Sequence, residues 1–378
     1  MRGNEVYIHE KTGWPRLTWD GERLAGLLAA VRHKQGRLLG KMEGLGFDLR
    51  AEANLTVLTS DVVKSSAIEG EALPPDEVRS SIAGRLGLDI AGLPKAGRNV
   101  EGVVDMMLDA TRHFDAPLTP QRMFDWHASL FPTGRSGISP ITVGAWRTHE
   151  SGRMRVVSGP VGNETVHFEA PAAQRLVSEM DAFLQWFNAP SEFDPVLKAG
   201  VAHLWFVTVH PFDDGNGRIA RAIADMALAR ADGTPDRFYS MSSQIEAERK
   251  DYYLQLEFAQ KGDTDITNWL AWFLACLGRA IDGAGETLGA VLRKARLWQR
   301  INRRPVSDRQ RLVINRMLGQ FEGFLSTSKY AKLAKCSADT ALRDIRELLE
   351  RGILVQNPSG GRSTSYRLAD LEDIAGDS

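Results

Sequence analysis

Helical periodicity recurs along almost the whole chain, and no other sequence feature restricts the fold as strongly. Residues 21–45 carry apolar side chains near the spacing of one helix face: Leu24, Leu27, Leu28, Val31, Leu38 and Leu39. Further helices are predicted at residues 52–67, 98–113, 120–130, 171–188, 194–209, 216–231, 245–260 and 265–297. The chain is therefore predicted to be mainly α-helical.

Residues 141–168 break the helical pattern. They carry valines and a phenylalanine separated by glycines, namely Val143, Val156, Val157, Val161, Val166 and Phe168 with Gly144, Gly152, Gly159 and Gly162. Residues 158–164, Ser-Gly-Pro-Val-Gly-Asn-Glu, have the chemistry of a hairpin turn. This region is predicted to form a short β-hairpin on the helical body.

The last part of the chain has a different organisation. Basic residues are frequent between Arg293 and Arg316, and Pro305 interrupts the helical pattern, so a domain boundary is expected near residues 300–306. Helices are then predicted at residues 307–320, 327–334 and 338–351, followed by strands at 353–355 and 365–368. A helix-turn-helix followed by a small hairpin is the order of a winged-helix domain.

Length and composition indicate a globular protein of several domains. The 378 residues favour two or three domains, and 43% hydrophobic with 25% charged residues are ordinary proportions for a chain with buried cores. The formal net charge of −1 gives the whole chain no electrostatic preference for nucleic acid or membranes. Residues 1–10 lack the apolar core of a signal peptide, and no apolar run approaches ~18 residues, so no membrane attachment is expected. Cys276 and Cys336 lie far apart without CxxC spacing, which favours a reducing cytoplasm.

Residues 210–221, His-Pro-Phe-Asp-Asp-Gly-Asn-Gly-Arg-Ile-Ala-Arg, are the most informative segment for chemistry. They connect two predicted helices. Gly215 and Gly217 remove Cβ atoms where a backbone can approach a ligand, and the second helix presents free N–H groups to an anion. Arg218 and Arg221 are three residues apart, so both reach one face and can bind phosphate oxygens.

Two further side chains complete this group. Asp214 offers a hard oxygen of the kind that Mg²⁺ binds together with substrate phosphates. His210 can accept a hydroxyl proton near neutral pH, a role typically worth ~10²–10⁴ in rate. Each residue alone has an ordinary structural explanation. Together they supply a base, a metal ligand, a phosphate cradle and two cations, a combination that folding alone does not require.

This segment resembles the signature of the Fic family, His-Pro-Phe-x-Asp-Gly-Asn-Gly-Arg-x-x-Arg, at every defined position. The resemblance implies a mainly α fold, a Fic-type helical bundle with a small β-hairpin flap, plus the C-terminal winged-helix domain. It implies a protein adenylyltransferase that transfers AMP from ATP to a Tyr, Thr or Ser hydroxyl of a target protein. The expected domains are a helical N-terminal extension at residues 1–95, a catalytic domain at 96–300 and the winged-helix domain at 301–378.

The resemblance also implies a role for each residue of the segment. His210 is the base that deprotonates the target hydroxyl, and Asp214 holds a Mg²⁺ ion that bridges the α- and β-phosphates. The hydroxyl attacks the α-phosphorus and pyrophosphate leaves. Arg221 binds the γ-phosphate, and Tyr253 lines the adenine pocket. The other nucleotide-binding positions are Gly215, Asn216 (backbone and side chain), Gly217, Arg218, Ile219 and Ala220.

Residues 65–70, Ser-Ser-Ala-Ile-Glu-Gly, resemble an inhibitory pattern of the same family, Ser/Thr-x-x-x-Glu-Gly/Asn. By this resemblance Glu69 pairs with Arg221 and competes with the γ-phosphate, so that ATP binds with a misplaced α-phosphate. A carboxylate–guanidinium pair is directional, and it is strong when shielded from water. The ordinary explanation of the same residues is a solvated glutamate at a helix end.

The predicted hairpin around Val161, Gly162 and Asn163 resembles the family's flap, which pairs its backbone with an extended segment of the target. Residues 144–147, Gly-Ala-Trp-Arg, resemble the element that leads to this flap. A simple structural hairpin is the alternative. The partners expected are ATP, a target protein, the chain itself as a substrate, and a second copy in a homodimer.

Other activities stay open at this level. Family members that phosphorylate carry a lysine where Gly217 stands, which favours AMP transfer here. A relative that transfers phosphocholine would share much of the segment, and an enzyme that removes AMP is a further alternative.

A DNA-binding regulator is the main alternative from another functional class. The helix predicted at 338–351 offers Thr340, Arg343 and Arg346 to a groove, with Arg362 and Arg367 in the wing. The same helix is also acidic, since it carries Asp339, Asp344, Glu347 and Glu350. A module that binds protein or dimerises is therefore an equally good interpretation.

Overall fold

The computed structural model describes residues 6–45, 47–88, 94–149, 152–160, 164–302, 306–318, 321, 323–358 and 364–369, with the backbone alone at residues 47–48, 286–288 and 290–302. The predicted turn at Val161, Gly162 and Asn163 and the wing residue Arg362 lie outside these ranges. Contacts divide the chain into two compact units, Met1–Glu286 and Thr287–Ser378. In the described part of the chain, every helix is too short or too polar to cross a bilayer.

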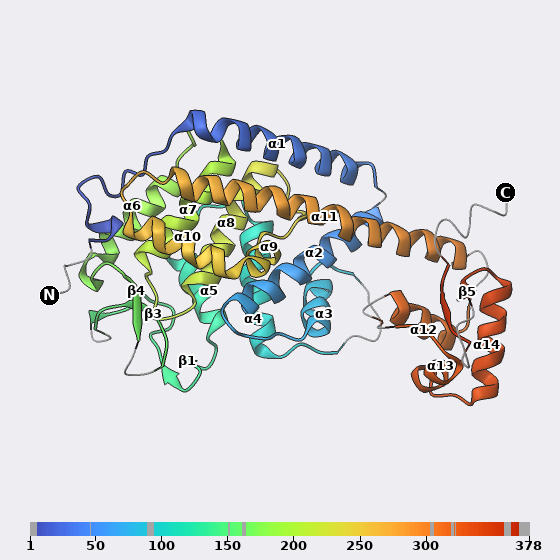
Figure 1. Cartoon of the computed structure of the whole chain (residues 1–378). Helices are drawn as coiled ribbons and strands as arrows, with labels where there is room; N and C mark the ends of the chain where they lie inside the picture. Colours follow the sequence, from blue (N-terminus) through green and yellow to red (C-terminus); the bar gives the residue numbers. More distant parts are fainter. Residues whose placement is uncertain are drawn as a thin grey trace. The chain divides into compact units, whose positions relative to one another are not determined.

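The first unit is a helical bundle (Figure 1). Short 3₁₀ turns, η1 (Ile8–Glu10) and η3 (Ala173–Arg175), precede α1 and α6. The helices are α1 (Gly21–Glu43), α2 (Phe47–Ile68), α3 (Pro75–Arg85), α4 (Arg98–Arg112), α5 (Pro120–Leu130), α6 (Leu176–Asn188), α7 (Pro195–Val209), α8 (Asn216–Asp232), α9 (Met241–Ala247), α10 (Arg249–Lys261) and α11 (Thr267–Asn302), whose first part belongs to this unit.

Helix α7 forms the centre of this unit. All its residues from 196 to 209 are buried, which is typical of a helix in the interior of a bundle. It starts at Pro195, and the Asp194 carboxylate caps it by accepting from Val196 N at 2.8 Å. Helix α8 packs along α7 more extensively than any other pair of described elements. The connection between these two core helices is the 210–215 segment.

Helix α2 brings the predicted inhibitory residues toward α8. It packs against α3 and α9 and contacts α8. Side chains of α2 hold the chain that follows α8: Asn54 Oδ1 accepts from Arg237 N at 2.8 Å, and Asp61 Oδ1 accepts from Ser242 N at 3.1 Å. After α2 ends, Gly70 takes φ +84°, a conformation that suits glycine. This turn directs the chain past the start of α8.

A β-hairpin stands on the helical body, as predicted. Strands β3 (Arg155–Ser158) and β4 (Thr165–Glu169) are antiparallel, with an irregularity between Val156 and Val157. Strand β4 contacts α10, so the hairpin lies beside the helix that carries Tyr253. The small pair β1 (Arg135–Ser136) and β2 (Ser139–Pro140) was not predicted.

After the end of α11, the described residues of the second unit form three further helices followed by a two-stranded antiparallel sheet. Its elements are α12 (Asp308–Leu318), α13 (Thr327–Ala334), α14 (Ala338–Glu350), β5 (Leu354–Gln356) and β6 (Tyr366–Leu368). Buried apolar side chains from all three helices form its own core, among them Val313, Ile314, Tyr330, Ala341, Ile345 and Leu348. This order of elements was predicted, whereas the winged-helix identity remains an interpretation.

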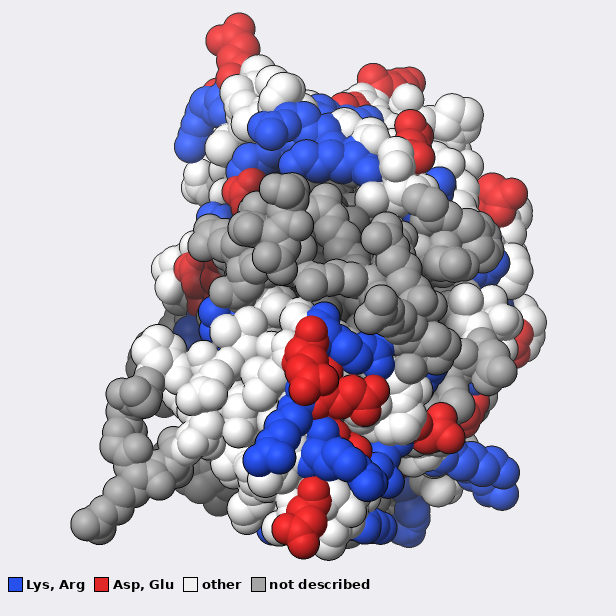
Figure 2. All heavy atoms as spheres, turned by 90° about the vertical axis from the view of Figure 1, so that its right-hand side faces the viewer, with Lys and Arg blue, Asp and Glu red and all other residues white. Residues whose placement is uncertain are grey.

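The charges of α14 are mixed, as the sequence indicates. Asp344 is buried, where it pairs with Arg309 at 2.6 Å and accepts from the Tyr330 hydroxyl at 3.0 Å. Arg343 and Arg346 are exposed. In the lower half of Figure 2, acidic and basic side chains are interspersed on the described surface. The part of the second unit that is described therefore offers no strong electrostatic argument for DNA.

Most predicted helix bounds agree with the structure to within a few residues, and two predicted helices differ from those observed. The predicted helix at 171–188 begins as the 3₁₀ turn η3, because Ala172 after Pro171 is still extended, with ψ 145°. The predicted helix at 245–260 is two helices, α9 and α10, that break at Glu248. The Glu248 carboxylate pairs with Arg279 of α11 at 2.5 Å, a tertiary contact that local sequence does not reveal.

Gly102 lies where the backbones of α4 and α5 approach each other closely, which gives the first prediction. An ideal Cβ there would lie 1.8 Å from Ser129 O, whereas a Cβ at Gly26 of α1 meets nothing within 4 Å. We expect Gly102→Ala to lower the free energy of unfolding by about 1–3 kcal/mol or more through forced separation of the helices. Gly26→Ala should leave it unchanged or raise it by roughly 0.5–1 kcal/mol. Chemical denaturation of both variants measures the difference, and equal stabilities would contradict this account of the packing.

Candidate active site

The segment between α7 and α8 begins and ends with a residue in the left-handed backbone conformation. His210 follows α7 with φ 50° and ψ 60°, and its N–H still donates to Phe206 O at 3.0 Å. Gly215 precedes α8 with φ 79°. A side chain at Gly215 would also meet Phe131, 2.8 Å from the ideal Cβ position. Positive φ is uncommon for a non-glycine residue, so the surrounding structure holds His210 in place.

Buried polar side chains fix the shape of this loop. The Asn216 amide accepts from Phe212 N at 3.0 Å and donates to Phe212 O at 2.8 Å. Arg147 donates to His210 O at 2.8 Å and to Pro171 O at 2.6 Å. In this structure the Asn216 side chain braces the loop, and the backbone N–H of Asn216 is left for a ligand; its predicted phosphate contact stays a prediction.

Ile219 and Ala220 contribute to the core. Both are fully buried, and Ile219 N donates to Gly215 O at 3.0 Å as part of the helix. The N–H groups at the very start of α8, those of Asn216, Gly217 and Arg218, are the ones that a helix leaves without an intrahelical acceptor. These three N–H groups are therefore available to a ligand, whereas the predicted nucleotide contacts of Ile219 and Ala220 stay predictions.

His127 of α5 supports the loop from another side. Its Nδ1 accepts from Gly144 N at 3.3 Å, so its Nε2 carries the proton and donates to Asp214 O at 3.2 Å. The ring stacks on Phe212 with centroids 4.3 Å apart. Burial lowers the pKa of His127 to about 4, despite the nearby carboxylates. No spacing pattern in the sequence singled out this residue.

His210 presents a neutral imidazole to the site. Its Nδ1 lies 3.2 Å from Val207 O, and because a carbonyl only accepts, Nδ1 carries the proton. Burial, together with the charge of Arg147, lowers the pKa of His210 to about 4 against the opposite effects of Val207, Glu69 and Asp214. The lone pair on Nε2 is therefore available at neutral pH, which is the state that a general base requires.

Two adjacent carboxylates lie in the same loop. Asp214 accepts from Gly215 N at 2.6 Å through Oδ1 and from the Ser136 hydroxyl through Oδ2. Asp213 accepts from Thr142 N at 2.9 Å through Oδ2, and its buried Oδ1 has no hydrogen-bond partner among the described residues. Each carboxylate oxygen has more than one lone pair, so Asp214 keeps capacity for a cation. The residues present fit Mg²⁺ bound by a carboxylate and substrate phosphates.

Two buried arginines of α8 contact carboxylates that follow α2. Arg221 Nη2 lies 2.8 Å from Glu69 Oε1, and Arg221 Nε donates to Ser65 Oγ at 2.9 Å. Arg218 Nη1 donates to Glu71 Oε2 at 2.7 Å. Burial opposes the charge of Arg221, but Glu69 outweighs it and holds the pKa of Arg221 above its usual value. Nη1 of Arg221 and Nε of Arg218 are buried without a partner among the described residues, so donors remain for an anion.

Gly217 lies against Glu69. A Cβ at this position would be 2.1 Å from Glu69 Oε1 and 3.3 Å from Arg221 Nη1. The sequence predicted that Gly217 makes room for a ligand. In this structure, the same room is taken by the carboxylate of Glu69.

A cavity of about 560 Å³ opens beside these groups, a size typical of small-molecule sites. Tyr253 lines it together with His210, and its hydroxyl donates to Ile68 O at 3.2 Å. The loop, α10 and the hairpin all contribute walls, through Glu69, His210, Gly217, Tyr253, Leu254, Val157 and His167. The cavity thus brings together residues predicted separately: those of the loop, Glu69 of the inhibitory pattern and Tyr253.

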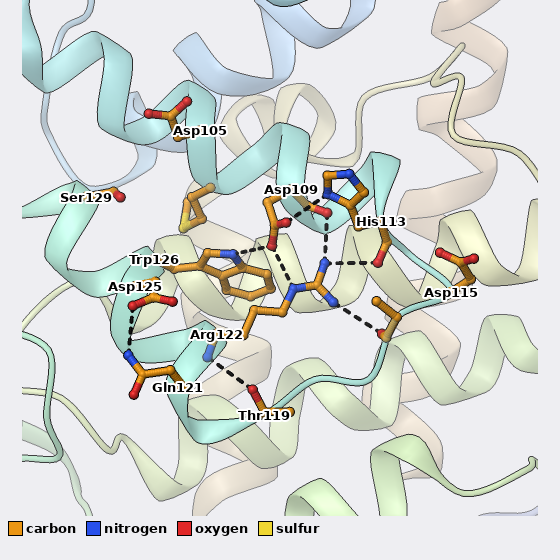
Figure 3. A pocket seen from close by; sticks show the side chains of 12 residues that line it. Asp105, Asp109, His113, Asp115, Thr119, Gln121, Arg122, Asp125, Trp126 and Ser129 are labelled. Atoms are coloured by element: carbon orange, nitrogen blue, oxygen red, sulfur yellow. Dashed lines mark hydrogen bonds and ion pairs between the residues drawn. The ribbon is translucent and has the colours of Figure 1, made fainter.

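A second hollow, on α4 and α5, has a different character (Figure 3). Asp109 accepts from Arg122 Nε at 2.6 Å and from Trp126 Nε1 at 2.7 Å, and it lies 2.9 Å from His113 Nδ1. Arg122 in turn donates to the carbonyls of Asp109 and His113 at 2.8 and 3.0 Å. These groups pair with one another, which identifies them as a brace between the two helices.

Sequence reasoning missed three residues of the site: Glu71, Asp213 and His127. Glu71 lies just beyond the matched inhibitory pattern, and Asp213 occupies a variable position of the Fic signature. Position in the chain next to a recognised motif was the available signal for both. His127 could not be found in this way, because only the fold brings α5 to the loop.

His203 of α7 lies in the core, where the charge of Arg221 affects its pKa. Its Nε2 lies 2.8 Å from the Tyr252 hydroxyl, and its ring stacks on Trp269 with centroids 5.7 Å apart. Complete burial, helped by the positive charge of Arg221, lowers the pKa of His203 to about 3. The ring is therefore neutral in the folded protein throughout the physiological range.

Comparison with known proteins places the loop in a recognised domain. A model of the Fic/DOC family matches residues 117–228, which include the whole 210–221 segment. A model described as a domain of unknown function (DUF4172) matches residues 7–88. The inhibitory-like residues 65–70 lie within that second match.

Several curated relatives carry the name protein adenylyltransferase. Fic-1 of Caenorhabditis elegans is 32% identical over 116 residues, which is 30% of this chain and 21% of the relative. The Fic protein of Nematostella vectensis is 33% identical over 135 residues, 35% of this chain and 29% of the relative. That of Culex quinquefasciatus is 27% identical over 228 residues, 58% of this chain and 40% of the relative. The matches thus span two fifths or less of these relatives.

Solved structures share the fold. A Fic family protein from Desulfovibrio desulfuricans superposes with a TM-score of 0.52 at 22% identity, covering 92% of this chain and 96% of that one. A Fic domain containing signalling protein from Bacteroides thetaiotaomicron gives a TM-score of 0.50 at 19% identity, covering 68% and 97%. The chain therefore has a mainly helical, Fic-type fold.

The buried His203 predicts how stability depends on pH. Its folded pKa, about 3, lies below the ordinary unfolded value of about 6.5, so below pH 6.5 the unfolded state binds more protons. The free energy of unfolding should therefore fall on acidification, by up to about 1.4 kcal/mol per pH unit from this group. His203→Gln removes the titration and keeps a partner for the Tyr252 hydroxyl. Denaturant titrations of both proteins at pH 7.5 and 5.5 should show a smaller loss for the variant, and equal losses would disprove the assignment.

Proposed function

Because the chain carries a Fic/DOC family domain, we propose that it is a protein adenylyltransferase, which transfers AMP from Mg-ATP to a Tyr, Thr or Ser hydroxyl of a target protein. One observation carries the proposal: a neutral His210 stands beside the start of α8, where two buried arginines retain free donors. The names of the curated relatives support AMP as the transferred group.

The start of α8 is the proposed binding site for the triphosphate. Its free N–H groups and helix dipole favour an anion at Asn216, Gly217 and Arg218. Arg221 lies one turn further and binds the γ-phosphate in this proposal. Tyr253, in the wall of the cavity, contacts the adenine.

His210 performs the proton transfer in this proposal. Its Nε2 takes the proton of the incoming hydroxyl as the oxygen attacks the α-phosphorus and pyrophosphate leaves. The neutral state that burial imposes on His210 keeps this lone pair available without prior deprotonation. Asp214 would hold Mg²⁺, which supplies positive charge to the phosphates when bound. Arg147, through its bond to His210 O, keeps the ring at this position.

Glu69 is the proposed inhibitory residue. Its carboxylate occupies the guanidinium that the γ-phosphate would bind and the space beside Gly217. Ser65 reinforces this arrangement, because both its hydroxyl and its carbonyl accept from Arg221, at 2.9 and 2.8 Å. Nucleotide can then bind only with its phosphates displaced from the in-line position, so the site is restrained until Glu69 leaves.

We further propose a cytoplasmic location and a homodimer, on sequence grounds alone. We also propose domain boundaries at residues 95 and 300. The winged-helix-like unit is proposed to contact protein or DNA. A steep loss of binding to duplex DNA with increasing salt would favour the DNA alternative.

Transfer to other proteins tests the activity, its base and its inhibition. Wild type, Glu69→Gly, and Glu69→Gly with His210→Ala are incubated with Mg²⁺, a soluble cell extract and ATP labelled at the α- or the γ-phosphate. We expect label from the α-phosphate in proteins of the extract, more with Glu69→Gly than with wild type. Adding His210→Ala should lower this transfer by about 10²–10⁴, the usual contribution of a general base.

Glu52→Gln is the matched control for the inhibitory carboxylate. Glu52 lies on the same helix α2 and pairs with Arg79 at 2.7 Å, away from the loop, so this variant should behave as wild type. Label from the γ-phosphate would identify a phosphoryl transferase instead. Failure of Glu69→Gly to exceed wild type would remove the inhibitory role, and absence of α-label with every variant would remove the transferase.

A further inference from the structure

The small hairpin of β1 and β2, which the sequence did not predict, contacts the loop at the proposed metal ligand. The Ser136 hydroxyl of β1 donates to Asp214 Oδ2. Shortly after the hairpin, Thr142 N donates to Asp213 Oδ2 at 2.9 Å. Residues 136–142 therefore contact both carboxylates of the loop.

Three contacts from different parts of the fold hold Asp214. Its backbone O accepts from His127 Nε2 at 3.2 Å, and its Oδ1 accepts from Gly215 N at 2.6 Å. One hydrogen bond to Oδ1 leaves the carboxylate partly free to rotate about its bond to Cβ. The hydrogen bond from Ser136 to Oδ2 restrains that rotation, so the orientation of the carboxylate depends on this serine.

The fold of the hairpin does not require the Ser136 side chain. The turn is set by Gly137 with φ 56° and by Arg135 Nη1, which donates to Ile138 O at 3.0 Å. Strands β1 and β2 pair through their backbones. The hydroxyl of Ser136 is instead directed at a carboxylate of the neighbouring loop.

The orientation of Asp214 matters because Mg²⁺ requires near-regular octahedral geometry, with oxygen ligands at about 2.0–2.1 Å. We propose that Ser136 is a positioning residue whose hydroxyl orients the Asp214 carboxylate for the Mg²⁺ that accompanies ATP. In this role Ser136 contacts neither the metal nor the nucleotide and acts only through Asp214. The inference rests on the proposed function, in which Asp214 holds Mg²⁺.

ATP binding without turnover tests the role of Ser136. The full chain with Glu69→Gly and His210→Ala, which lacks the inhibitory carboxylate and the proposed base, is titrated with ATP by calorimetry, once with Mg²⁺ and once with EDTA. Adding Ser136→Ala should raise the Kd of ATP by about 10–100-fold with Mg²⁺, the usual effect of removing a group that orients a metal ligand. The Kd with EDTA should stay unchanged. An equal rise in both conditions would indicate a general disturbance of the loop and overturn the proposal.

Two further variants serve as controls. Ser139 is the exposed cross-strand partner of Ser136, so Ser139→Ala should leave both Kd values unchanged. Ser136→Thr keeps a hydroxyl and should retain the affinity that depends on Mg²⁺. Melting temperatures confirm that all variants stay folded.

A double-mutant cycle shows whether Ser136 acts through Asp214. Asp214→Ala should raise the Kd of ATP with Mg²⁺. Ser136→Ala added to it should have no further effect, because the carboxylate that the hydroxyl orients is gone. A further rise would mean that Ser136 itself contacts the metal or the phosphates, which would overturn the positioning role.

The outcomes separate this inference from the proposed function. Weaker binding with Asp214→Ala but not with Ser136→Ala overturns the inference and leaves the proposed function intact. An unchanged Kd with Asp214→Ala removes the metal ligand from the proposed function, and the role of Ser136 with it. Mg²⁺-dependent binding that responds to Ser136→Ala, without label transfer to any extract protein, overturns the transferase and supports the role of Ser136 in binding Mg-ATP.

Discussion

The buried guanidinium of Arg221 is the interaction on which the rest of the site depends. A charged group in the interior is costly unless an anion pairs with it, and breaking a buried pair typically costs about 3–5 kcal/mol. Glu69 provides that anion, and Ser65 saturates two further donors. A γ-phosphate would satisfy the same requirement. In the proposed function, inhibition and substrate binding both satisfy the same electrostatic requirement, because the guanidinium has to be paired in either state.

The loop around this charge is shaped by its own polar groups rather than by a ligand. Asn216 bonds both backbone groups of Phe212, His127 bonds the Asp214 carbonyl, and Arg147 bonds the His210 carbonyl. These bonds are satisfied without a nucleotide, so the loop that carries the proposed base and phosphate-binding groups is preorganised. Preorganisation explains how a strained, left-handed His210 persists. It also gives Asn216, a residue of the signature, a structural role that is in place without a ligand.

The local parts of this architecture could be predicted from the sequence, and the long-range parts could not. Helix periodicity located α7 and α8, and the spacing of glycines and arginines located the loop between them. The break at Glu248 was not predicted; this residue pairs with Arg279 of α11, a partner that local sequence does not reveal. The pairing of Arg218 with Glu71, the support from His127 and the depressed pKa of His210 all depend on neighbours far away in the chain. Residue types indicate which chemistry is available, whereas burial and tertiary partners set the protonation state that this chemistry requires.

His210 reaches the state that the proposed base requires through burial rather than through a charged partner. Desolvation keeps the ring neutral, and the carbonyl of Val207 fixes its tautomer. A carbonyl adds no charge, so His210 relies on desolvation to stay unprotonated, and its lone pair needs no orienting carboxylate.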